Sequence, residues 1–197
     1  MVNLKFHNKN YYIILNILFC LIPLSYIIGN FAINLNVFLL IVFSLIVNNK
    51  RIFKTKLLLI DKIILCFFVF ALFSGIVNSL ESLSGNYDNS ILIKSILFFR
   101  YLLLYFILRY LVEKNIIIFK WFFISSLICT LFVCLDILYQ FTFSTDIFGL
   151  EPLHPSKLSG PFGDELIAGG YIHKFSLFSI FVLPFFKFKK TYLSLIL

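Results

Sequence analysis

A run of polar and turn-forming residues, Gln140–Ile167, holds the side chains best suited to chemistry in this 197-residue chain. Its glycines and prolines favour turns that expose backbone N–H groups. Lys157 is followed closely by Ser159, Gly160 and Gly163. N–H groups gathered beside a lysine can bind a phosphate, so we predict an anion site here. The alternative is a solvated interfacial loop whose lysine contacts lipid headgroups.

Two carboxylates, Asp164 and Glu165, follow these turns directly. A carboxylate near the membrane surface can accept the proton of an attacking sugar hydroxyl, so both are candidate catalytic bases. The alternative is a helix-start signal, because carboxylates stabilise the positive end of a helix dipole. His154 and His173 have no second ligand at metal-binding spacing and are interpreted as polar surface residues. The sequence indicates neither a metal site nor a cofactor.

Charged and polar side chains also occur inside apolar runs. A mid-bilayer arginine costs at least about 2.5–3.5 kcal/mol, so Arg100 should face protein, water or a lipid phosphate. With Lys94 it could form a track for an anionic lipid; the alternative is a structural pair of Arg100 with Asp136. Spacings of three and four place Asp136, Tyr139 and Gln140 on one helix face. We expect that face to line the mouth of a cavity under the loop.

The composition requires lipid as the solvent of most of the chain. It is 61% hydrophobic and 13% charged, with a mean hydropathy of +1.01. Soluble domains have about 25% charged residues, so a soluble globule is excluded. The four cysteines lie inside apolar runs with no CxxC spacing, and are interpreted as small apolar side chains rather than zinc ligands or disulfides.

Six apolar runs approach the length of about 20 residues that a helix needs to cross a bilayer. They are Tyr11–Gly29, Phe31–Val47, Leu57–Val77, Ile91–Val112, Ile116–Tyr139 and Ala168–Phe186. A seventh begins at Tyr192–Leu197. The predicted fold is all-α, a polytopic integral membrane protein with one transmembrane domain over residues 1–197. We expect it to be the N-terminal part of a longer protein of about 10–12 spans.

The distribution of basic residues predicts the orientation. Thirteen of the 17 Lys and Arg residues fall in the connections or adjoining span ends on one side of the membrane, and only Lys157 and Lys174 are assigned to the other side. Cytoplasmic loops carry the excess of positive charge, so the N-terminus is expected in the cytoplasm and residues 140–167 on the outer, periplasmic side. This topology explains the net charge of +8, and no nucleic-acid partner is indicated.

Three stretches resemble a known family: Asp136–Gln140, Asp146–Gly149 and Lys157–Tyr171. They are similar to the bacterial O-antigen ligase and O-antigen polymerase family of membrane glycosyltransferases. In that family a similar outer loop, of the form basic residue, small apolar residue, Ser or Thr, Gly, any residue, Phe, follows the first group of spans. The resemblance covers about 35 residues, and the hydrophobic pattern fits the N-terminal half of the family.

This resemblance implies transfer of a glycan from undecaprenyl diphosphate to lipid A core sugars or to another glycan, at the bacterial inner membrane. The partners would be that donor, that acceptor and membrane lipid. Lys157 would stabilise the departing diphosphate. The family usually has arginine there, and lysine lacks the bidentate fork of arginine. The family's larger outer loop, with its own basic residue and histidine, is expected beyond Leu197.

The candidate site therefore has two parts. The catalytic candidates are Lys157, Asp164 and Glu165. The candidates for binding the diphosphate are Ser159, Gly160, Gly163, Arg100, Lys94, Tyr139 and Gln140. The alternative functions are a non-enzymatic carrier or export component for polyprenyl-linked sugars, and a structural membrane protein.

Overall fold

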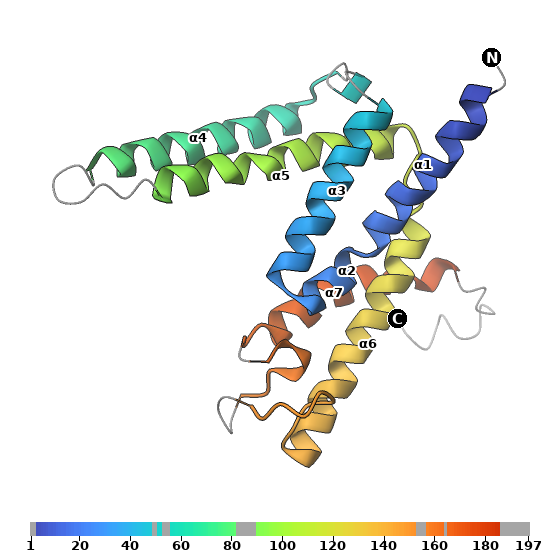
Figure 1. Cartoon of the computed structure of the whole chain (residues 1–197), viewed down its shortest axis with the longest axis vertical. Helices are drawn as coiled ribbons and strands as arrows, with labels where there is room; N and C mark the ends of the chain where they lie inside the picture. Colours follow the sequence, from blue (N-terminus) through green and yellow to red (C-terminus); the bar gives the residue numbers. More distant parts are fainter. Residues whose placement is uncertain are drawn as a thin grey trace. The chain divides into compact units, whose positions relative to one another are not determined.

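The computed structural model describes residues 3–48, 51–52, 56–81, 90–152, 157–163 and 165–185. Every regular element among them is helical, which confirms the predicted all-α class (Figure 1). The chain divides into two compact units, Met1–Leu39 with Ile117–Leu197 (unit 1) and Leu40–Ile116 (unit 2). One boundary falls inside the helix Asn30–Asn48, and the other falls between Ile116 and Ile117.

Four helices in the described part of the chain are long and apolar enough to cross a bilayer. They are α3 (Asn30–Asn48), α4 (Leu59–Glu81), α5 (Ser90–Glu113) and α6 (Phe119–Phe143). At about 1.5 Å per residue, helices of 19–25 residues match the roughly 30 Å of hydrocarbon in a bilayer. Only 11% of the most apolar stretch of α5 is buried, as expected for a helix whose side chains face lipid. These helices correspond to the second to fifth predicted spans, although α4 begins at Leu59 rather than Leu57 and α6 begins at Phe119 rather than Ile116.

The first predicted span forms two helices, α1 (Asn3–Cys20) and α2 (Ile22–Ile28), bent by 48° at the break between them. Pro23 causes the break, because it has no N–H and its ring conflicts with the carbonyl of Phe19. The Tyr171 hydroxyl donates to the Pro23 carbonyl at 3.0 Å and holds the bend in place. Counted as one bent span, the pair raises the number of candidate spans to five.

The sixth predicted span, Ala168–Phe186, does not form a continuous long helix. Helix α7 (Ala168–Ile180) has 13 residues, about 20 Å, which is shorter than the hydrocarbon core. Pro184 explains its end, since it cannot donate an N–H and would conflict with the carbonyl of Ile180. The short 3-10 helix η4 (Leu183–Phe185) follows. The prediction of six spans is therefore not confirmed, and the start of a seventh, Tyr192–Leu197, lies outside the described residues.

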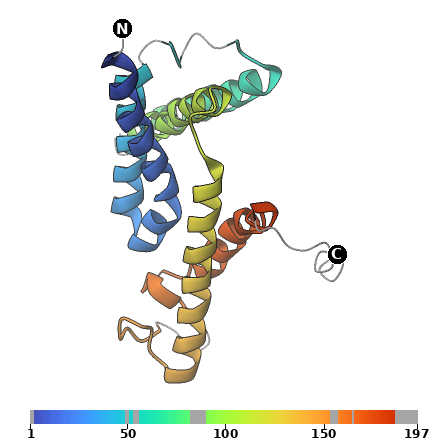
Figure 2. The ribbon, with the colours of Figure 1, turned by 90° about the vertical axis from the view of Figure 1, so that its right-hand side faces the viewer.

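In unit 1, α6 carries most of the packing. Helix α7 and the 3-10 helix η3 (Gly160–Phe162) pack along it, and α1 and α2 also contact it. Aromatic rings join these helices: the centroid of Phe122 lies 4.6 Å from that of Phe19 on α1 and 5.2 Å from that of Phe178 on α7. Figure 2 shows α7 beside α6, with the connecting loop at the C-terminal end of α6.

In unit 2, α4 and α5 lie side by side along most of their length (Figure 1). The rings of Phe68 and Phe98 stack between them at 4.9 Å. Gly75 of α4 faces Ser95 of α5 so closely that a Cβ added to the glycine would lie 2.5 Å from the Ser95 Cβ. Small residues of this kind let helix backbones approach each other within a membrane.

Replacing Gly75 by alanine should therefore weaken the packing of α4 on α5, by about 1–3 kcal/mol. Adding Ser95→Gly in the same chain should recover most of the loss, because it removes the side chain that the new methyl group meets. Circular-dichroism melts in detergent micelles measure both effects. Gly169→Ala is the matched control, because a Cβ there meets nothing within 4 Å. Equal effects at Gly75 and Gly169 would contradict the close contact.

Candidate functional site

The loop after α6 begins with two local turns. Ser144 adopts a left-handed conformation, φ 64°, and its N–H donates to the Gln140 carbonyl at 2.9 Å, which ends the helix. A second turn is closed by Asp146, whose Oδ1 accepts from the Leu150 N–H at 2.6 Å. Gly149 supplies the positive φ of 83° that this turn needs. The first part of the loop is thus compact.

Two buried side chains of α6 hold the loop against the helix. Asp136 is 0% exposed, and its Oδ1 accepts from the Ile147 N–H at 2.8 Å. Gln140, which is 1% exposed, accepts from the Gly160 N–H through Oε1 at 2.9 Å. The two residues are four apart and share a helix face. The same face of α6 therefore anchors the loop at two points, Ile147 and Gly160.

The predicted anion-binding segment, residues 157–163, lies directly on α6. Gly160 has φ +57°, and a Cβ there would come 3.0 Å from Ile137 Cγ1, so both conformation and space favour glycine. Gly160 begins the 3-10 helix η3, and Gly163, with φ +59°, ends it. Ser159 is buried against the helix, whereas Lys157 is exposed. The structure thus places all four predicted residues on this one segment, with the Lys157 side chain exposed.

Three buried oxygens around these anchors have no hydrogen-bond partner among the described residues. They are Asp136 Oδ2, Asp146 Oδ2 and Ser159 Oγ. Buried polar atoms are normally paired, so this cluster has capacity for a further polar contact. Asp146 was not among the residues singled out by the sequence. Its position ten residues after Asp136, in a Gly- and Asp-containing turn, was the signal that could have identified it.

The other candidates near the loop lie apart from this cluster. Glu165 is exposed, and its Oε1 accepts from Asn30 Nδ2 at 3.5 Å. Ile167 is the N-cap of α7 and makes no side-chain capping bond, and the alternative in which Asp164 and Glu165 stabilise the helix dipole stays a prediction. Tyr139 is 40% exposed, and its ring packs on Phe143 at 4.5 Å. Asp164 lies outside the described residues.

Lys94 and Arg100 belong to α5, in unit 2. Lys94 is exposed, whereas Arg100 donates from Nη2 to the Tyr101 hydroxyl at 3.0 Å and stacks over that ring. The two basic residues are six apart, about 1.7 helical turns, so their side chains leave α5 in different directions. This spacing does not favour a continuous basic track. The track and the pairing of Arg100 with Asp136 both stay predictions.

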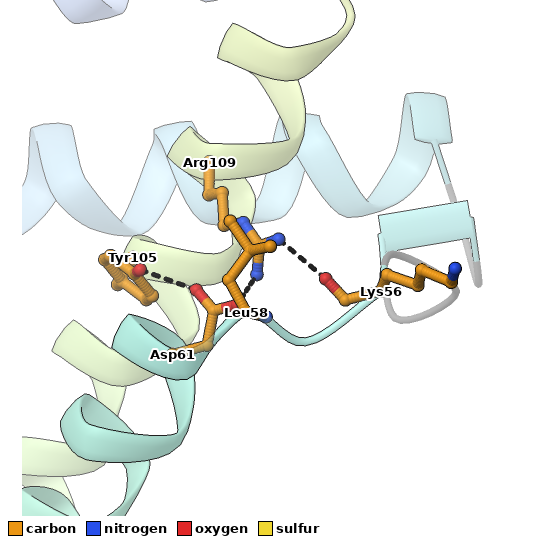
Figure 3. A network of polar contacts seen from close by, with 5 residues as sticks. All are labelled: Lys56, Leu58, Asp61, Tyr105 and Arg109. Atoms are coloured by element: carbon orange, nitrogen blue, oxygen red, sulfur yellow. Dashed lines mark hydrogen bonds and ion pairs between the residues drawn. The ribbon is translucent and has the colours of Figure 1, made fainter.

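A charged cluster that the sequence analysis did not single out joins α4 to α5 in unit 2. Figure 3 shows Asp61 of α4 between Tyr105 and Arg109 of α5. Arg109 forms an ion pair with Asp61, and Tyr105 donates to Asp61 Oδ1 at 2.7 Å. The Leu58 N–H also donates to Asp61, and Arg109 donates from Nη2 to the Lys56 carbonyl at 2.7 Å. The carboxylate, 0% exposed, is therefore well satisfied despite its burial.

Sequence signals for this cluster were present but weak. Asp61 is an acidic residue at the start of an apolar run, in a connection that otherwise carries basic side chains. Arg109 lies near the end of the next run, 48 residues later. Helices joined by a short connection pack antiparallel, so these two ends meet. The cluster fastens the α4–α5 pair of unit 2.

Replacing Gln140 by leucine should release the loop from α6. The buried Gly160 N–H would lose its acceptor, at a cost of about 1–3 kcal/mol. Amide hydrogen exchange at residues 157–163 should then become about tenfold faster or more. Thr142→Val is the control, because among the described residues the exposed Thr142 hydroxyl bonds only carbonyls of its own helix. Unchanged exchange in the Gln140 variant would show that the loop is held by other contacts.

Comparison with known proteins identified no relative of this chain. No protein-family model matches the chain, and no match was found among curated proteins or solved structures.

Proposed function

We propose that this chain takes part in transferring a glycan from undecaprenyl diphosphate to lipid A core sugars or to another glycan. One observation carries the proposal. The segment that resembles the O-antigen ligase and polymerase family is built onto the end of an apolar helix through Gln140, and it leaves Lys157 exposed. An exposed lysine on a segment that packs beside the end of a long apolar helix suits a ligand whose charge lies at the membrane surface.

The chemistry requires three tasks. The oxygen of an acceptor hydroxyl attacks the anomeric carbon of the donor, and the bond from that carbon to the diphosphate oxygen breaks. The diphosphate leaves with the bonding electrons, so negative charge develops on it. In the proposed reaction, the positive charge of Lys157 stabilises that negative charge. The hydroxyl proton needs an acceptor, and the exposed carboxylate of Glu165 is available. Asp164 is the second candidate for this role.

Loss of the gene tests the proposed reaction. In the host, deletion should abolish the surface glycan and cause the glycan linked to undecaprenyl diphosphate to accumulate, because the transfer step is blocked. The gene supplied in trans should restore both. Chromatography of extracted lipids and electrophoresis of surface glycans measure the two pools. A deletion strain in which both pools are unchanged would contradict the proposal.

The proposed reaction also requires the loop to face outward, with the N-terminus in the cytoplasm of a bacterial inner membrane. In a variant whose four cysteines are replaced by serine, Cys at Phe148 should react with a membrane-impermeant maleimide in intact cells. Cys at Lys114 should react only after the membrane is permeabilised. Both side chains are exposed in the structure, so accessibility alone should not separate them. The reverse labelling pattern would overturn this orientation.

A further inference from the structure

Unit 1 contains an aromatic groove. It runs between α1, α2, α6 and α7 and has a volume of about 470 Å³, within the usual range for ligand sites. Its lining is apolar and chiefly aromatic, with one charged residue among the described lining side chains. Residues that define it include Phe19, Tyr26, Phe122, Phe123, Phe178 and Lys174.

Lys174 gives this groove a polar end. The side chain is exposed, whereas Phe178 and Phe181 follow it at spacings of four and three on the same face of α7. Phe181 lies about 10 Å farther along the helix axis. The groove therefore offers a positive charge at one end and a continuous series of rings beyond it.

The charged end of the groove is the end nearer the loop. Phe162 of the loop packs on Tyr171 at 5.4 Å, and Tyr171 lies one helical turn before Lys174. In addition, Lys157 and Lys174 are the two basic residues that the charge distribution assigns to the outer side. A ligand with its phosphate at Lys174 would extend its apolar part away from the loop.

We propose that this groove binds the isoprenoid chain of a polyprenyl phosphate, and that Lys174 contacts the phosphate. The inference rests on the proposed function, which supplies such a lipid as the donor's carrier. The ligand matches the groove in two respects: a single apolar chain fits a single aromatic channel, and an anionic headgroup complements one lysine. An ordinary phospholipid has two chains, and a zwitterionic headgroup has no net charge for Lys174 to complement.

A second groove provides a matched comparison. It lies against Leu18, Leu24 and Leu35 in the same unit, has a volume of about 200 Å³, and has no charged residue among its described lining side chains. Both grooves are apolar, so nonspecific contact with lipid is expected at both. Specific recognition of a polyprenyl phosphate should occur only at the groove that carries Lys174.

Photocrosslinking of the full chain in lipid nanodiscs tests the inference. Benzoylphenylalanine would replace Phe178 or Phe181 in the aromatic groove, or Leu35 in the comparison groove. Radiolabelled undecaprenyl phosphate and radiolabelled phosphatidylglycerol are the two probes, at equal mole fraction. We expect the undecaprenyl probe to label positions 178 and 181 about tenfold more than position 35. Lys174→Gln should reduce that labelling about 10- to 100-fold, the value of one charge-assisted contact, and Lys174→Arg should retain it.

The controls separate this inference from the proposed reaction. Lys120→Gln changes an exposed lysine of the same unit that is not among the described lining residues, and should leave labelling intact. Undecaprenyl phosphate carries no glycan, so labelling does not depend on transfer. Intact labelling in a protein without transfer activity would refute the proposed reaction alone. Equal labelling at positions 178, 181 and 35, preferential labelling by phosphatidylglycerol, or full labelling of Lys174→Gln would refute the lipid site.

Discussion

Replacing Arg109 by leucine is expected to lower the stability of unit 2 markedly. Asp61 would then remain buried with a negative charge that has lost its ion-pair partner. The Tyr105 hydroxyl and the Leu58 N–H would still donate to it, but neither carries a compensating positive charge. Titration of the purified protein with sodium dodecyl sulfate in mixed micelles, followed by circular dichroism, measures the change.

A double substitution isolates the cause of this loss. With Asp61→Leu and Arg109→Leu together, no buried charge remains unpaired, so most of the stability should return. Lys62→Leu is a useful control because it removes an exposed charge next to Asp61. If the Arg109 single variant and the double variant were equally unstable, the loss would come from packing around Arg109 rather than from the ion pair.

Replacing Lys157 by glutamine is expected to reduce glycan transfer by about 10²–10³-fold, the usual effect of removing one group that stabilises developing charge. The side chain is exposed, so membrane insertion and the fold of α6 should be unaffected. Lys157→Arg should keep or increase activity, because a guanidinium can bind two phosphate oxygens at once. The amount of surface glycan formed after a pulse of labelled sugar in a deletion strain measures the series.

The matched control for Lys157 is Lys120→Gln, which removes an exposed positive charge of the same unit far from the loop in sequence. It should retain full transfer. Equal losses in both variants would point to a general effect of surface charge. Full transfer by Lys157→Gln would remove Lys157 from the mechanism.

The long apolar helices were predictable because a lipid bilayer restricts the length and composition of any segment that crosses it. A spanning helix must bond its own backbone and expose apolar side chains, so its length and composition show directly. The predicted spans within α3, α4, α5 and α6 follow from this demand. Pro23 and Pro184 lie inside the predicted first and sixth spans, but the sequence analysis did not predict helix breaks at them. These two prolines account for the bent first span and the short α7.

The candidate site was predictable in part for a different reason. Asp136 and Gln140 share a helix face by spacing alone, and glycine-rich turns are evident from composition. The sequence did not show that Gln140 would accept a hydrogen bond from the Gly160 N–H. The two residues are 20 apart, and sequence alone does not define the course of the loop between them. The pairing of Asp61 with Arg109 depends in the same way on how two helices pack.

The most direct test of the central proposal follows the leaving group itself. Proteoliposomes containing the chain, a glycosylated undecaprenyl diphosphate labelled with ³²P, and an acceptor glycan report release of undecaprenyl diphosphate. We predict release that depends on the acceptor for the wild-type chain and falls about 10²-fold or more for Lys157→Gln. Equal release by the two proteins, or release that is the same without acceptor, would contradict a role for the Lys157 segment in glycan transfer.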